Sequence, residues 1–168
     1  MKKVLVSLAV HEKPDVIKDQ IKNFKFFLKN VVFILHVSKS YFDKYDIEEL
    51  KGIEDVYINP ENLITKWGNI VSTHISNYNY AKDNIKFDYI LLHSSNDMLV
   101  RHGAYEYIIQ HDAGYQLRKV NKNNVHWWPA FLAMKDFQLE QMKNEIGQTT
   151  LIASQLEGSF YKKEIMDK

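Results

Sequence analysis

Short apolar runs alternate with helical repeats of apolar residues in the first part of this chain. Val4–Val10 is an apolar run rich in β-formers, with lysines before it and charged residues after it. Such a run is typical of a strand that is buried on both faces of a parallel sheet. Pro14 then opens a helical pattern, and proline suits the first turn of a helix because its missing N–H would have no partner there. The apolar positions of that pattern are Val16, Ile17, Ile21, Phe24 and Leu28.

The same alternation continues to the end of the sequence. We predict further strands at 31–37, 55–58, 87–92 and 149–153, and further helices at 66–81, 104–110, 135–144 and from 161 onward. No internal repeat, low-complexity tract or Gly/Ser linker divides the chain, so we expect one domain over residues 1–168. Strands that alternate with helices predict an α/β fold, in which a mostly parallel sheet is flanked by helices.

Ligands bind such sheets at the carboxyl ends of the strands, in the loops that lead into helices. This rule selects the loops 9–14, 36–40 and 93–103 as candidates. His11, His36 and His93 each fall near such an end. A single histidine there is usually a hydrogen-bonded structural residue, whereas three that converge are more typical of a functional site.

Composition excludes several classes of function. The chain has 22 basic and 21 acidic residues and a net charge of +1, so neither nucleic acid nor an anionic membrane is the expected partner. It has no cysteine, which excludes disulfides, thiolate metal sites and a cysteine nucleophile. No apolar stretch approaches the roughly 20 residues that a membrane helix needs. We expect a soluble, cytoplasmic protein with no transmembrane segment.

The loop after the strand predicted at 87–92 carries the most informative polar residues. Ser94, Ser95, Asn96 and Asp97 follow the apolar run, at a place where many sugar-nucleotide enzymes hold a metal and a diphosphate. Two carboxylates around one residue would predict a Mg²⁺ or Mn²⁺ site. Ser95 stands in place of the first carboxylate, so we expect no metal. Asp97 then either contacts a ligand or caps a turn, as aspartate often does.

Two further features carry candidate chemistry. Glu157 precedes Gly158 between a predicted strand and a predicted helix. A carboxylate held there can take the proton from an attacking hydroxyl, or it can simply favour a helix N-terminus. Trp67 and the pair Trp127–Trp128 lie beside predicted loops. Exposed tryptophan packs well on sugar rings, although tryptophan more often packs in a core.

Four segments in order resemble the core-2/I-branching β-1,6-N-acetylglucosaminyltransferase-like family, including its bacterial members. Residues 8–14 resemble its Ala-His…Pro signature, and residues 34–40 its Ile-His-Val-Asp-Lys run with Ser38 in place of the acid. Residues 65–68 resemble its Trp-Gly segment, and residues 87–97 its Tyr-Asp-Tyr…Leu-Ser-Gly-x-Asp segment. Residues 156–160 resemble the region around the family's catalytic glutamate.

The resemblance implies a GT-A-like fold, a UDP-sugar donor, a glycan acceptor and an inverting reaction without metal or cofactor. Glu157 becomes the general base. The expected substrate-binding residues are Ala9, His11, His36, Trp67, Ser94, Ser95, Asn96 and Asp97. The family's basic residues for the diphosphate lie downstream of the glutamate, and the sequence ends 11 residues after Glu157. It also ends inside a predicted helix, so we expect a C-terminally truncated chain. The alternative is a non-catalytic sugar-nucleotide or glycan-binding domain, or an inactive fragment of a transferase.

Overall fold

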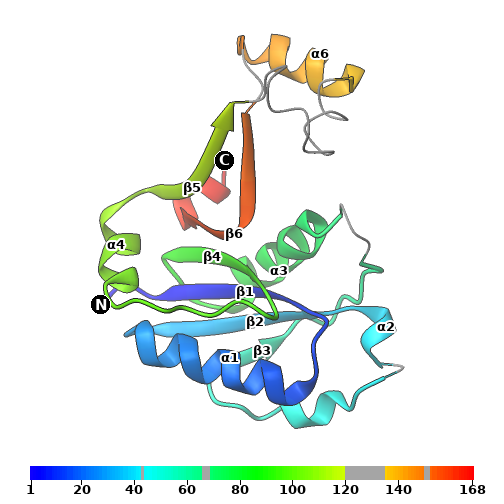
Figure 1. Ribbon diagram of the computed structural model, residues 1–168, viewed down its shortest axis with the longest axis vertical. Helices are drawn as coiled ribbons and strands as arrows, with labels where there is room; N and C mark the ends of the chain where they lie inside the picture. The colour runs from blue at the N-terminus through cyan, green and yellow to red at the C-terminus, as the bar shows by residue number, and fades with distance from the viewer. Residues whose placement is uncertain (43, 66–68, 120–134, 150–151) are drawn as a thin grey trace. The chain divides into compact units, whose positions relative to one another are not determined.

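The computed structural model describes residues 1–42, 44–65, 69–119, 135–149 and 152–168. These residues form two compact units. The first unit comprises Met1–Gly114 and Leu156–Lys168, and the second comprises Tyr115–Gln155. The predicted α/β class is confirmed, because the chain forms a mixed six-stranded sheet flanked by helices (Figure 1).

The sheet has the strand order β3-β2-β1-β4-β6-β5. Its strands are β1 (Val4–Val10), β2 (Val31–Val37), β3 (Val56–Ile58), β4 (Tyr89–Ser94), β5 (Ala113–Lys119) and β6 (Ile152–Lys162). Strands β1 to β4 are parallel to one another, with β1 between β2 and β4. β6 pairs with β4 in the antiparallel direction. The adjacency of the strands at 4–10, 31–37 and 89–94 confirms the predicted parallel core.

Helices cover both faces of the parallel strands in the first unit. Its helical segments are α1 (Pro14–Phe27), α2 (Lys39–Phe42), the 3₁₀ turn η1 (Ile47–Leu50), α3 (Val71–Asn84), α4 (Ala104–Gln110) and α7 (Lys163–Met166). α1 and α3 lie on opposite faces of the sheet (Figure 1). The second unit contains α6 (Phe137–Glu145). No helix among the described residues is both long enough and apolar enough to span a membrane.

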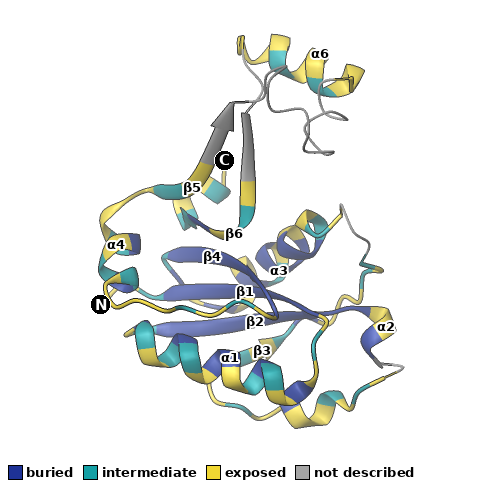
Figure 2. Ribbon diagram, viewed as in Figure 1, coloured by how far each residue is buried: buried dark blue, intermediate teal, exposed yellow. Residues whose placement is uncertain are grey.

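The core explains why the apolar runs become strands. Every residue of β1, β2 and β4 is buried, and Figure 2 shows these strands as continuous dark ribbons between α1 and α3. In α1, Ile17, Ile21 and Phe24 pack on one face of the sheet. Burying each such side chain contributes about 1.5–3 kcal/mol. Pro14 occupies the first turn of α1, as predicted.

Several predicted boundaries are wrong. The fourth strand ends at Ser94 rather than at residue 92, because its pairing with β1 continues to Ala9↔Ser94. The last strand covers 152–162 instead of 149–153, so the helix predicted from residue 161 is reduced to 163–166. Pairing with β4 keeps this segment extended, since Tyr161 lies opposite Ile90. β5 was not predicted.

Candidate functional site

A buried hydroxyl joins the loops that follow β1 and β4. Ser95 is 0% exposed, and its Oγ accepts the backbone N–H groups of His11 at 3.0 Å and Glu12 at 3.2 Å. The same oxygen lies 3.0 Å from His11 Nδ1. His11 Nδ1 also lies 3.2 Å from the carbonyl oxygen of Ala9, and its Nε2 lies 3.9 Å from Glu12 Oε1.

Ser95, His11 and Glu12 have the residue types of a hydrolase triad, but their geometry does not suit one. A nucleophilic hydroxyl must reach the substrate and give its proton to the base as it attacks. Ser95 Oγ is inaccessible and already accepts two hydrogen bonds. The serine therefore fixes the two loops together, while His11 is exposed beside them.

Asp97 folds back onto its own loop. Its Oδ2 accepts the backbone N–H of Ser94 at 3.3 Å and lies 3.2 Å from His93 Nδ1. Gln20 of α1 donates from Nε2 to the carbonyl oxygens of Ser94 at 2.6 Å and Asp97 at 2.7 Å. The turn-capping role of Asp97 is thus observed. Its side chain is still 33% exposed, so it can also contact a ligand, as can the exposed Asn96.

Glu157 reaches the same edge of the sheet from β6. Its Oε1 accepts a hydrogen bond of 3.0 Å from Ser94 Oγ, across 63 positions of sequence. β6 pairs with β4 up to Leu91↔Phe160, which carries residue 157 toward the carboxyl end of β4. Gly158 has φ +80°, a left-handed conformation that glycine adopts without strain. The glutamate is half-buried, and Ser94 orients one of its two oxygens.

The two buried histidines of the candidate set have structural surroundings. His36 is 0% exposed, and its Nε2 accepts the backbone N–H of Leu63 at 3.0 Å. His93 is 7% exposed and packs edge-on against Phe24, with ring centres 4.9 Å apart. Burial lowers the pKa of both imidazoles, although the Asp97 carboxylate opposes this effect at His93. Both are therefore neutral at pH 7.

The strand register confirms that the predicted positions share one edge of the sheet. Ala9 is 3% exposed and lies between His36 on β2 and Ser94 on β4. His11 directly follows β1, and Asp97 lies in the loop that follows β4. Side chains alternate between the faces of a strand, so His36 faces α3 whereas His93 faces α1. Trp67 lies outside the described residues.

A buried polar network, not predicted from the sequence, lies on the α3 side of the sheet. Ser7 Oγ lies 2.8 Å from His74 Nδ1 and accepts from Asn77 Nδ2 at 2.9 Å. Burial, followed by the charges that His93 and His36 carry when protonated, lowers the pKa of His74 to about 4. The available signal was Ser7, a polar residue in the middle of an apolar run.

A second part of this network holds the loop after β3. Asn59 donates from Nδ2 to Ser76 Oγ at 2.8 Å and to Asn77 Oδ1 at 3.0 Å. Ser76 Oγ also donates to the Glu61 carboxylate, and the Glu61 backbone N–H donates to Asn59 Oδ1 at 2.9 Å. With the bond from Leu63 to His36, these contacts fix residues 59–63 against α3 and β2.

Within the described ranges, no group of three or more histidine, aspartate or glutamate side chains is placed to hold a metal ion. No known protein-family model matches the sequence, and no curated protein shows significant similarity to it.

Proposed function

We propose that this protein is an inverting glycosyltransferase with a GT-A-like fold. It would transfer a sugar, N-acetylglucosamine by the resemblance of its motifs, from a UDP donor to a hydroxyl of a glycan acceptor. One observation supports this most strongly. Glu157 is hydrogen-bonded to Ser94 at the carboxyl end of β4, beside the loop that Ser95 fixes to the end of β1. A half-buried carboxylate at that edge of a parallel sheet suits a general base.

In this proposal, Glu157 accepts the proton of the acceptor hydroxyl. The hydroxyl oxygen attacks the anomeric carbon from the face opposite the diphosphate and forms the new glycosidic bond. The bond between the anomeric carbon and the phosphate oxygen breaks, and UDP leaves with its electron pair. Ser94 donates to Oε1, so Oε2 is the oxygen available to take the proton. Ser94 is thus a positioning residue that holds the carboxylate in place.

The leaving diphosphate requires positive charge or N–H donors. The N-terminus of α1 directly follows the β1 loop, and its N-cap residue, Lys13, makes no side-chain capping bond. The first-turn N–H groups that follow Pro14 and the exposed Lys13 ammonium together suit an anion, and the Asp15 carboxylate in the same turn opposes them. His11 and Asn96 are exposed at the same edge, where they can contact the nucleotide or its sugar.

Calorimetric titration with UDP, GDP, CDP and UDP-N-acetylglucosamine tests the donor assignment. We expect UDP and its sugar to bind, and Lys13→Gln to weaken both by about 10- to 150-fold, since a charge-assisted bond contributes about 1.5–3 kcal/mol. Lys86→Gln is the matched control, because it removes another exposed lysine charge, near the amino end of β4. If none of the uridine nucleotides binds to the wild-type protein, the proposal is wrong.

A further inference from the structure

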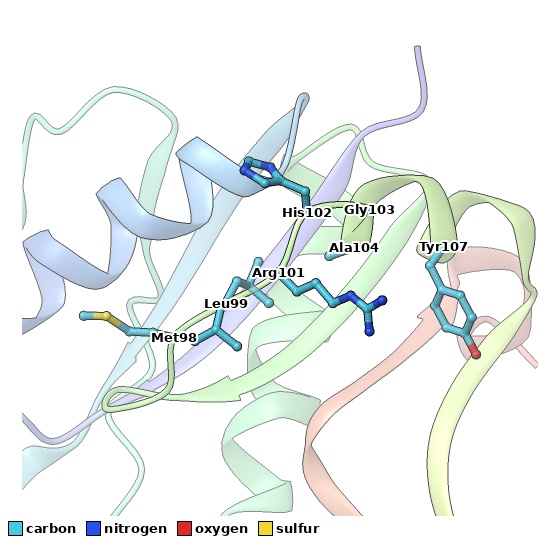
Figure 3. A pocket seen from close by; sticks show the side chains of 8 residues that line it. Met98, Leu99, Arg101, His102, Gly103, Ala104 and Tyr107 are labelled. Atoms are coloured by element: carbon cyan, nitrogen blue, oxygen red, sulfur yellow. The ribbon is translucent and has the colours of Figure 1, made fainter.

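An open cavity of about 520 Å³ lies along the chain between β4 and α4. Residues 98–104 and Tyr107 line it, and all of them belong to the first unit (Figure 3). Its volume lies within the roughly 300–1,000 Å³ that is usual for ligand sites. None of the lining residues takes part in the chemistry proposed for Glu157. The cavity nevertheless begins at Met98, the residue that follows Asp97.

Helix α1 holds the loop that forms this cavity. Asn23 accepts the backbone N–H of Leu99 at 2.8 Å and donates to its carbonyl oxygen at 3.0 Å, as a neighbouring strand would. Further along the loop, the centre of the His102 ring lies 5.5 Å from that of Phe26 and 5.0 Å from that of Phe27. These contacts fix the loop before any ligand arrives, so binding to its free side requires little further ordering.

The free side of the loop presents an exposed cation. Arg101 is exposed and makes no hydrogen bond or ion pair with any residue in the described part of the chain. Figure 3 shows its guanidinium extending to the side of the loop where Tyr107 lies, whereas His102 points to the opposite side. The lysines of the adjacent α1 differ, since Lys18 and Lys22 each pair with a carboxylate.

Exposed apolar surface adjoins this cation. Val100 is 89% exposed and Tyr107 is 56% exposed, and both line the cavity. A guanidinium binds a carboxylate or a phosphate through two parallel hydrogen bonds. The Tyr107 ring stacks on the His111 ring, with ring centres 4.3 Å apart, and its remaining exposed surface and hydroxyl suit a ring that carries hydroxyl groups. The cavity thus combines one anion-binding group with surface for a ring.

We propose that this cavity is a subsite for an anionic saccharide, a sugar that carries a carboxylate or a phosphate. The anion binds Arg101, and the sugar ring packs against Tyr107 and Val100. The choice of a sugar as the ring rests on the proposed function, to which the subsite adds the acceptor class. The acceptor that gives its hydroxyl proton to Glu157 is then an acidic glycan.

Calorimetry on the full chain tests this subsite with three probes. Glucuronic acid carries a carboxylate, glucose 1-phosphate carries a phosphate, and methyl glucoside is the neutral control. Each is titrated into wild-type protein, Arg101→Gln and Lys86→Gln, the last of which removes an exposed charge from a residue that does not line the cavity. Far-UV circular dichroism melting verifies that all three proteins are folded.

We expect at least one anionic sugar to bind to wild-type protein and to Lys86→Gln about tenfold more tightly than methyl glucoside. Arg101→Gln should abolish this preference. Binding of glucuronic acid alone identifies a carboxylate ligand, and binding of glucose 1-phosphate alone identifies a phosphate ligand. Equal binding of neutral and anionic sugars, no binding of any sugar, or a preference that survives Arg101→Gln overturns the subsite.

The donor titration separates this proposal from the proposed function. UDP binding without any effect of Arg101→Gln on saccharide binding leaves the transferase standing and removes the subsite. Arg101-dependent binding of an anionic sugar without UDP binding supports the subsite and removes the proposed transferase.

Discussion

Acidification should destabilise the fold, because unfolding releases a buried imidazole that then takes up a proton. His74 is 4% exposed and contacts Ser7 Oγ through its Nδ1. Burial lowers its pKa to about 4, from 6.5 for an unperturbed histidine. Between these two values the unfolded chain binds a proton at this position and the folded chain does not.

The sign and size follow from proton linkage. A folded-state pKa below the unfolded value means that the stabilisation is complete above pH 6.5 and is lost as the pH falls toward 4. Each bound proton changes the unfolding free energy by about 1.4 kcal/mol per pH unit in that window. His74 alone should therefore remove about 2 kcal/mol of stability between pH 8 and pH 5. His36 and His93, whose pKa values burial also lowers, act in the same direction.

Urea denaturation at pH 8 and pH 5, followed by circular dichroism, measures this loss. His74→Gln keeps an amide that can bond to Ser7 but does not titrate. We expect the wild type to lose about 2 kcal/mol more than this variant between the two pH values. His111→Gln, at an exposed histidine, should lose as much as the wild type. Equal losses for the wild type and His74→Gln would refute a buried, neutral His74.

Three other predictions concern the packing of Phe160, the hydrogen bonds of Ser95 and the metal dependence of UDP binding. Gly114→Ala should lower the unfolding free energy by about 1–3 kcal/mol, because a Cβ at this position would overlap the buried ring of Phe160; an unchanged melting temperature contradicts this. Ser95→Ala should also lower the unfolding free energy by about 1–3 kcal/mol, because the N–H groups of His11 and Glu12 lose their acceptor. Urea denaturation measures this loss, and an unchanged unfolding free energy would show that Ser95 does not hold the two loops together. UDP binding should be unchanged by EDTA, because Ser95 replaces the first acid of a carboxylate pair; binding that EDTA abolishes and Mn²⁺ restores would show the opposite.

The sequence predicted the parallel core because the physical signal there is strong and local. The strands at 4–10 and 31–37 are uninterrupted apolar runs, and the structure has the same bounds. The end of β4 was misplaced because His93 and Ser94 are polar, yet hydrogen bonds to Asp97 and Glu157 allow them to be buried. β5 had a usable signal, since apolar and polar residues alternate from Ala113 onward.

The sequence predicted the residues of the candidate site better than it predicted the residues to which they hydrogen-bond. Ser95 was correctly expected at the edge of the sheet, but its bonds to His11 and Glu12 cross 84 and 83 positions of sequence. Pairing of His74 with Ser7 likewise crosses 67 positions. Such contacts depend on which strands become neighbours, and the local pattern of apolar and polar residues does not contain that information.

The most direct test of the proposed function compares Glu157→Gln with the wild type in single-turnover sugar transfer. The amide preserves the shape of the side chain and can still accept from Ser94 Oγ, but it cannot take the acceptor proton. We expect the transfer rate to fall about 10²- to 10⁴-fold while the dissociation constant of the UDP-sugar and the melting temperature stay unchanged. Turnover close to that of the wild type would show that Glu157 is not the base, and so contradict the account.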